Sequence, residues 1–178
     1  MDVLEAIRSH RSCRQFQPRP VPAEKLKLIL SAARLAPSQN NMQPWRFVVV
    51  QDDERKRLLA QACVKGKPVA EAPVIVVAFA VEEDIPLTVG GYISAYPLDV
   101  AVAIGQLRLA ATAEGLGSVW LVDFHEEKVR TVLGVPEGVH PIAIIPMGYP
   151  AEPNGGAKGD GEGRKSPDEI IAYNEYAW

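Results

Sequence analysis

The chain has 178 residues, of which 47% are hydrophobic and 23% are charged, as in an ordinary globular protein. No apolar run approaches the roughly 20 residues that cross a bilayer, which argues against a transmembrane helix and a membrane partner. The net charge of −3 argues against a nucleic-acid partner, but residues 1–46 hold eight Lys and Arg against three acids, which favours a local anion site.

The two cysteines, Cys13 and Cys63, lack the spacing of a metal cluster or a disulfide framework, so we expect two reduced thiols. The first ten residues carry charges and no apolar stretch of the kind found in signal peptides. We therefore expect a cytoplasmic protein, and its length fits a single domain over residues 1–178.

Apolar periodicity and capping residues predict helices and strands that mostly alternate along the chain. In chain order they are a short helix after Asp2, a helix after Pro22, a strand at 45–51, a helix capped by Asp52, a loop at 64–73, a strand at 74–81, a long irregular connection at 82–97, an apolar helix at 98–114, a strand at 118–124, a helix at 126–133, a strand at 142–149, a flexible glycine-rich loop at 150–165 and a last helix after Ser166. This order predicts an α/β or α+β fold around one mixed sheet.

The helix predicted at 98–114 is apolar on nearly every side, which is typical of a helix buried in a core or an interface. Its many alanines and Gly105 would let another backbone approach closely.

The first candidate site is the basic segment that contains His10, Arg11, Ser12 and Arg14. Arginine offers forked donors that match phosphate oxygens, and serine adds a neutral donor. The segment therefore suits a phosphate, although on spacing alone a solvated basic loop is the favoured interpretation, because short basic runs are common.

The second candidate is the polar run at 37–45, in which Ser38, Asn41 and Gln43 stand between a helix and a strand. Their amides both donate and accept, so they suit the edge of a planar heterocycle. The alternative is a polar turn that satisfies its own backbone.

Two further candidates follow. The glycines at 115–117 would let backbone approach a flat ring or would simply end a helix, and the pair Arg164 and Lys165 would close over an anion or form a charged hinge. The sequence has neither a dinucleotide fingerprint nor a metal-binding histidine pair, and no serine or cysteine has an evident base. We therefore expect that a bound cofactor supplies any difficult chemistry.

These pieces, in this order, resemble the nitroreductase family of flavoproteins. The segment HRSCRQF resembles that family's R-[RH]-S-x-[RK]-x-F, and PSQNNMQPWRF resembles its P-S-x-x-N-x-Q-P-W-x-F. Later blocks, including the long apolar helix, IAIIPMGYPAE and RKSPDEII, are also similar, so the resemblance covers nearly the whole chain.

The resemblance implies an α+β fold with a mixed central sheet flanked by helices, and an intertwined homodimer with FMN at the subunit interface. The FMN-binding residues that it implies, together with two lysines that stand where the family often has Asn or Gln, are His10, Arg11, Ser12, Arg14, Ser38, Asn41, Gln43, Lys65, Lys67, Leu121, Val122, Asp123, Arg164 and Lys165. His10 departs from the family's usual arginine.

The implied activity is hydride transfer from NADH or NADPH, through FMN, to a small acceptor such as a nitroaromatic or a quinone. No side chain is expected to be an obligatory acid or base, and no metal is expected. Two alternatives remain: an enzyme of the same fold that reduces or remodels flavin, and a non-catalytic homodimer that binds FMN or another phosphorylated metabolite.

Overall fold

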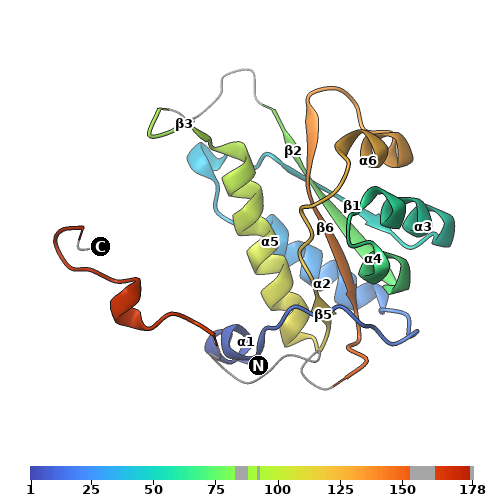
Figure 1. Cartoon of the computed structure of the whole chain (residues 1–178), viewed down its shortest axis with the longest axis horizontal. Coiled ribbons are helices and arrows are strands. Elements are labelled where there is room, and N and C mark those ends of the chain that lie inside the picture. Colours follow the sequence, from blue (N-terminus) through green and yellow to red (C-terminus); the bar gives the residue numbers. More distant parts are fainter. Residues whose placement is uncertain (83–87, 92, 153–162, 177–178) are drawn as a thin grey trace.

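The computed structural model describes residues 1–82, 88–91, 93–152 and 163–176 (Figure 1). Its centre is a four-stranded sheet in the order β1-β2-β6-β5. The strands are β1 (Trp45–Val50), β2 (Val74–Val81), β5 (Gly117–Ser118) and β6 (Val139–Gly148). Neighbouring strands run antiparallel, and one parallel bridge joins Ser12 to Ser118 at the β5 edge. The predicted α+β fold with a mixed sheet is therefore confirmed.

The sheet separates two apolar cores, because side chains alternate between its faces. Val74, Val76 and Ala78 of β2 pack in the core that contains α2 and α5, whereas Ile75 and Val77 pack in the core that contains α3 and α6. Figure 1 shows α5 and α3 on opposite sides of the sheet. The helices are α1 (Val3–Ser9), α2 (Ala23–Arg34), α3 (Asp53–Ala62), α4 (Lys67–Glu71), α5 (Tyr96–Ala113) and α6 (Glu126–Leu133).

Helix α5 crosses one whole face of the sheet and is the apolar helix predicted at 98–114. It begins two residues earlier than predicted, because Pro97 falls in the first turn, where its missing N–H needs no partner. At the other end Lys25 of α2 pairs with Glu114 at 3.2 Å between Nζ and Oε2, and Gly115 turns the chain at a φ of 75°. Among the described helices none is both long and apolar enough to cross a bilayer.

Some predicted elements differ in the structure. The loop predicted at 64–73 contains α4, which has Pro68 in its first turn. The strand predicted at 118–124 is reduced to β5 and two isolated antiparallel bridges, Leu121 to Ile144 and Phe124 to Cys63. The last helix is only a 3-10 turn, Pro167–Glu169, although the capping box that predicted it is present. Isolated short helices are unstable without packing, and this turn has no buried residue.

The connection predicted to be irregular at 82–97 contains a two-stranded hairpin of β3 (Thr88–Val89) and β4 (Ile93–Ser94). Most of the glycine-rich loop predicted at 150–165 lies outside the described residues, which resume at Gly163.

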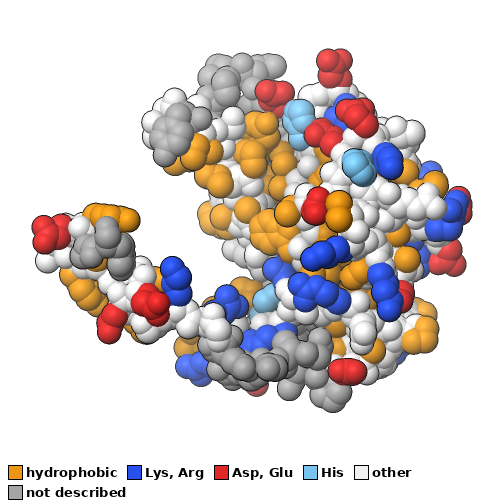
Figure 2. Space-filling model, viewed as in Figure 1, with side chains coloured by type: hydrophobic (Ala, Val, Ile, Leu, Met, Phe, Trp, Pro, Cys, Tyr) orange, Lys and Arg blue, Asp and Glu red, His pale blue; other side chains and the backbone are white. Residues whose placement is uncertain are grey.

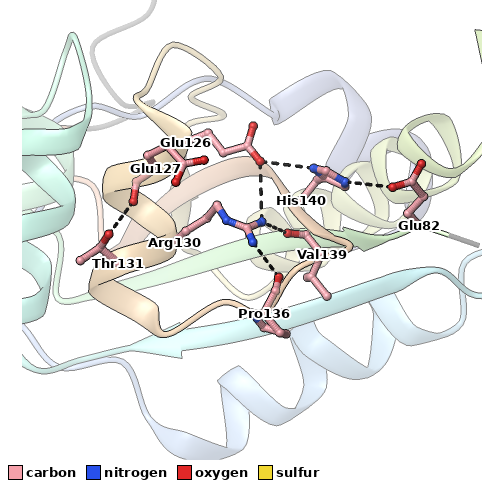
Figure 3. Close-up of polar contacts among 8 residues, drawn as sticks. All are labelled: Glu82, Glu126, Glu127, Arg130, Thr131, Pro136, Val139 and His140. Atoms are coloured by element: carbon pink, nitrogen blue, oxygen red, sulfur yellow. Dashed lines mark hydrogen bonds and ion pairs between the residues drawn. The ribbon is translucent and has the colours of Figure 1, made fainter.

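A polar cluster ties the start of β6 to α6 (Figure 3). His140 lies between two carboxylates, with its Nδ1 3.3 Å from Glu126 Oε1 and its Nε2 3.4 Å from Glu82 Oε2. Arg130 donates to the carbonyls of Val139 and Pro136 at 2.6 and 2.9 Å. These contacts fix α6 against the sheet at the end opposite β5.

Candidate functional site

The N-terminal segment after α1 lies along the β5 edge of the sheet. The N–H of Cys13 donates to the carbonyl of Ser118 at 3.0 Å, and the N–H of Gln17 donates to the carbonyl of Tyr149 at 2.8 Å. Gly117 permits this approach, because a β-carbon there would lie 2.4 Å from Cys13 Cβ. The sheet edge therefore holds the basic segment beside the C-terminal half of α5.

Arg108 of α5 reaches this segment and joins it to β5. Its Nη2 donates to Ser12 Oγ and its Nε donates to Ser118 Oγ, both at 3.4 Å. We refer to Ser12, Arg14, Arg108 and Ser118 as the Arg108 cluster. Among the described residues no carboxylate forms an ion pair with either arginine of the cluster. Burial, and secondarily the charge of Arg14, lowers the pKa of Arg108. The cluster thus carries unneutralised positive charge.

His10 adjoins the cluster as a neutral group. Its Nδ1 lies 2.9 Å from Thr112 Oγ1, and that hydroxyl donates to the carbonyl of Arg108 at 3.0 Å. Because the threonine proton is already donated, we assign the His10 Nδ1–H as the donor to Thr112. Burial, followed by the charges of Arg108 and Arg11, lowers the pKa of His10 from 6.5 to about 4. His10 is therefore uncharged at neutral pH.

This lowered pKa predicts an acid-sensitive contribution to stability. Between pH 6.5 and 4 the unfolded chain binds a proton at His10 that the folded chain does not bind, so folding becomes less favourable as pH falls through this window. For a partly exposed group we expect about 1–2 kcal/mol after allowance for solvent screening. Urea unfolding at pH 7.5 and pH 4 should show a larger loss of stability for the wild type than for His10→Gln, and equal losses would contradict the prediction.

The amide-rich turn lies at the other end of α5. It contains the 3-10 turn Gln39–Asn41. The N–H of Gln39 donates to the Asp99 carboxylate of α5 at 3.1 Å. Ser38 Oγ accepts from the N–H of Gln43 at 3.0 Å, so the predicted self-satisfied polar turn is present. However, the backbone at Asn41 and Gln43 has φ angles of 59° and 52°, which residues other than glycine rarely adopt. Both side chains are exposed. Such local strain is typical of functional sites.

The turn and the Arg108 cluster are not brought together within one chain. Asp99 contacts the turn and Thr112 contacts His10, and the helical rise between these two residues of α5 is about 20 Å. Figure 1 shows the turn beside the N-terminal end of α5 and α1 beside the C-terminal end.

The remaining predicted residues lie in two places: the segment after β5 with the loop that leads into α4, and the C-terminal segment. Leu121, Val122 and Asp123 follow β5 and lie beside the Lys65 loop, because the N–H of Val64 donates to the carbonyl of Asp123 at 3.1 Å. Lys65 is exposed, and Lys67 approaches Glu71 at 3.7 Å.

Arg164 and Lys165 lie in the C-terminal segment, which extends away from the sheet in Figure 1. Neither makes a hydrogen bond or an ion pair within the described part of the chain.

Two residues of the cluster, Arg108 and Ser118, were not predicted from the sequence. The available signal was that Arg108 is the only basic residue of a largely apolar helix. The described residues contain no group of acidic, histidine or cysteine side chains able to hold a metal ion. Burial raises the pKa of the Cys13 thiol, and burial and Asp123 raise that of Cys63 to about 11, so neither is a ready thiolate.

Comparisons with known proteins give a consistent result. The model of the nitroreductase family matches residues 7–83 and 60–149. The chain is 35% identical to an NADH dehydrogenase of Thermus thermophilus, over 85% of this chain and 88% of that protein. It is 30% identical to a 5,6-dimethylbenzimidazole synthase of Rhodospirillum rubrum, over 85% and 83% respectively. It is 28% identical to an NAD(P)H-dependent FMN reductase of Bacillus subtilis, over 85% and 67%.

Solved structures agree with the family match. A nitroreductase family protein from Clostridium difficile 630 superposes with a TM-score of 0.86 at 30% identity, covering 99% of this chain and 100% of that one. An FMN-dependent nitroreductase from Clostridium difficile R20291 superposes with a TM-score of 0.82 at 28% identity, covering 97% and 99%.

Proposed function

Since this chain belongs to the nitroreductase family, we propose that residues 1–178 form one FMN-binding domain of a homodimeric, cytoplasmic oxidoreductase. The enzyme takes electrons from NADH or NADPH and passes them to a small acceptor such as a nitroaromatic or a quinone. The observation that carries the proposal is the unneutralised positive charge of the Arg108 cluster, which fits the phosphate of FMN.

FMN, when bound, supplies the hydride chemistry of the reaction. The protein supplies binding, orientation and charge. Ser12 and Arg14 hold the phosphate, and Arg11 and the pair Arg164 and Lys165 are the further donors that the family pattern implies. Positive charge at Lys65 or Lys67 would stabilise the negative charge that develops on the ring, because fixed charges near a reacting group need no reorganisation.

The amide-rich turn would serve the ring and the ribityl chain. Ser38, Asn41 and Gln43 offer hydroxyl and amide groups that donate and accept, and the backbone of Leu121, Val122 and Asp123 would lie against the ring. Because the turn lies about 20 Å along α5 from the cluster, the two parts of the site come from different subunits.

An apolar stripe on α5 supports this two-chain site. Leu98 and Val102 are 47% and 44% exposed, and Gly105, Leu109 and Ala113 continue the same helix face at spacings of three and four residues. Figure 2 shows apolar side chains gathered over α5. A groove of about 520 Å³ between α1, α2 and α5 extends this surface, with Leu35 and Leu109 in its lining.

A second copy of the chain is the occupant that this surface fits. A two-fold axis across α5 would pair the two stripes with the helices antiparallel. The N-terminal end of one α5, with its amide-rich turn, would then lie near the Arg108 cluster of the other. The C-terminal segment supports an intertwined dimer, because Ile170, Ile171 and Tyr173 are at least half exposed on a segment that extends away from its own sheet (Figure 1).

The experiment that tests the function is a visible spectrum of the purified protein with and without FMN, followed by NADH or NADPH addition. We expect bound flavin with its yellow absorbance. Anaerobic addition of NADH or NADPH should bleach this absorbance, and it should return when a quinone or a nitroaromatic is added. A protein that binds no FMN and oxidises neither nucleotide would refute the proposal.

A second candidate function has specific support, because the relatives include an FMN reductase and a 5,6-dimethylbenzimidazole synthase. In that case the flavin itself would be the substrate that is reduced or remodelled. Chromatography of the flavin after NADH addition separates the two functions: the cofactor is recovered unchanged in the first and is released reduced or converted in the second. Binding of FMN without any turnover would indicate the non-catalytic alternative.

A further inference from the structure

Arg108 is an unusual residue for its position. Helix α5 has only two charged residues, Asp99 and Arg108. The guanidinium of Arg108 is partly buried. Its two hydrogen bonds, to the hydroxyls of Ser12 and Ser118, are 3.4 Å long, beyond the usual range of 2.7–3.2 Å. A guanidinium has five N–H donors, so most of its hydrogen-bonding capacity is unused by these contacts.

The charge of Arg108 has no counter-charge in the described part of the chain. A partly desolvated cation is costly unless an anion neutralises it, and here the charge that acts on Arg108 is the like charge of Arg14. Two guanidiniums and two hydroxyls with no carboxylate among them form the donor set that a phosphate monoester requires.

His10 does not supply that charge. It stands at the first position of the family's phosphate-binding pattern, but its Nδ1–H is donated to Thr112. In the neutral ring its Nε2 is an acceptor, which would repel rather than bind a phosphate oxygen. The low pKa of about 4 keeps the ring in this neutral form near pH 7.

We infer that Arg108 is a binding residue for the phosphate of FMN and takes the role that the family pattern assigns to position 10. Ser12 and Ser118 orient its guanidinium, and His10 is a neutral positioning residue that holds α5 against the N-terminal segment through Thr112. This inference rests on the proposed FMN site, but it concerns only the phosphate end of that site.

The test compares FMN with riboflavin, which has the same ring and no phosphate. Flavin fluorescence quenching by the purified apoprotein gives both dissociation constants. Arg108→Gln should weaken FMN binding by about 10- to 100-fold, the range for hydrogen bonds to a charged group, and should leave riboflavin binding within about 3-fold. Arg108→Lys should recover part of the loss, and His10→Gln should keep FMN binding within about 3-fold at pH 7.5. The control is Arg57→Gln, which removes an exposed arginine of α3 paired with Glu54.

Two outcomes would overturn the inference: unchanged FMN binding in Arg108→Gln, or equal weakening of FMN and riboflavin, which would indicate a structural role. A wild type that binds no flavin would refute the proposed function, and inorganic phosphate would then test the site by itself. Phosphate should raise the melting temperature of the wild type and of Arg57→Gln but not that of Arg108→Gln. A rise of equal size in all three proteins would also overturn the inference.

Discussion

Val102→Glu should convert the proposed dimer into a 19.4 kDa monomer and release FMN. Val102 lies in the middle of the apolar stripe of α5 and is 44% exposed in the single chain, so the substitution should leave the fold of that chain intact. In a two-fold dimer it buries two carboxylates next to each other without a partner. An unpaired buried charge costs about 3–5 kcal/mol, so the dimer dissociation constant should rise at least about 1,000-fold.

Light scattering after size-exclusion chromatography measures the mass, and the flavin absorbance of each peak measures retention of FMN. The matched control is Val64→Glu, which places the same charge at a valine that is 63% exposed and lies outside the stripe. Val64→Glu should remain a yellow dimer. If Val102→Glu also remains dimeric, the stripe is not the interface, and if it is monomeric but retains FMN with wild-type affinity, one chain holds the whole site.

Gly117→Ala should destabilise the fold and weaken FMN binding together. A β-carbon at position 117 would lie 2.4 Å from Cys13 Cβ and 2.8 Å from Cys13 Sγ. The two segments cannot separate freely, because the N–H of Cys13 is bonded to the carbonyl of Ser118. Overpacking of this kind costs about 1–3 kcal/mol, which corresponds to a loss of about 2–12 °C in melting temperature for a chain of this size. Displacement of Ser12 and Arg14 should raise the FMN dissociation constant about 10-fold or more.

Thermal unfolding and FMN titration check both parts of this prediction. A double-mutant cycle provides the control, because Cys13→Gly removes the two atoms that the new methyl group meets most closely. The double variant should be more stable, by about 1 kcal/mol or more, than the sum of the two single effects predicts. Additive effects, or a Gly117→Ala protein as stable as the wild type, would show that the close approach at this edge is not what holds the basic segment.

Local signals in the sequence predicted much of the fold. Asp2 and Asp52 cap the helices that they were expected to cap, and the strand predicted at 74–81 has those bounds, because capping and apolar runs depend on neighbouring residues. The last helix was predicted from an equally good local signal and is absent, since a capping box cannot replace tertiary packing. Packing also explains α4 in the segment predicted as a loop at 64–73, because Pro68 is tolerated near the helix N-terminus and both Pro68 and Val69 are buried.

The candidate site was only partly predictable, for a related reason. The basic residues at 10–14 were identified because they are adjacent in sequence. Arg108 and Ser118 join them through contacts that cross about a hundred residues of chain, which periodicity does not reveal. Likewise, His10 was expected to bind phosphate from its place in the pattern, and only the packing against Thr112 and the nearby arginines indicates that it is neutral.

The position of the amide-rich turn and the Arg108 cluster at opposite ends of α5 has a consequence for how the protein retains FMN. If each site is completed by a second subunit, the fraction of sites that retain FMN depends on the concentration of the protein chain, through the monomer–dimer equilibrium. Dilution would then loosen FMN even when free flavin is abundant, and FMN would in turn strengthen the association of the subunits. The length of one helix would thereby make the cofactor content of the enzyme depend on its own concentration.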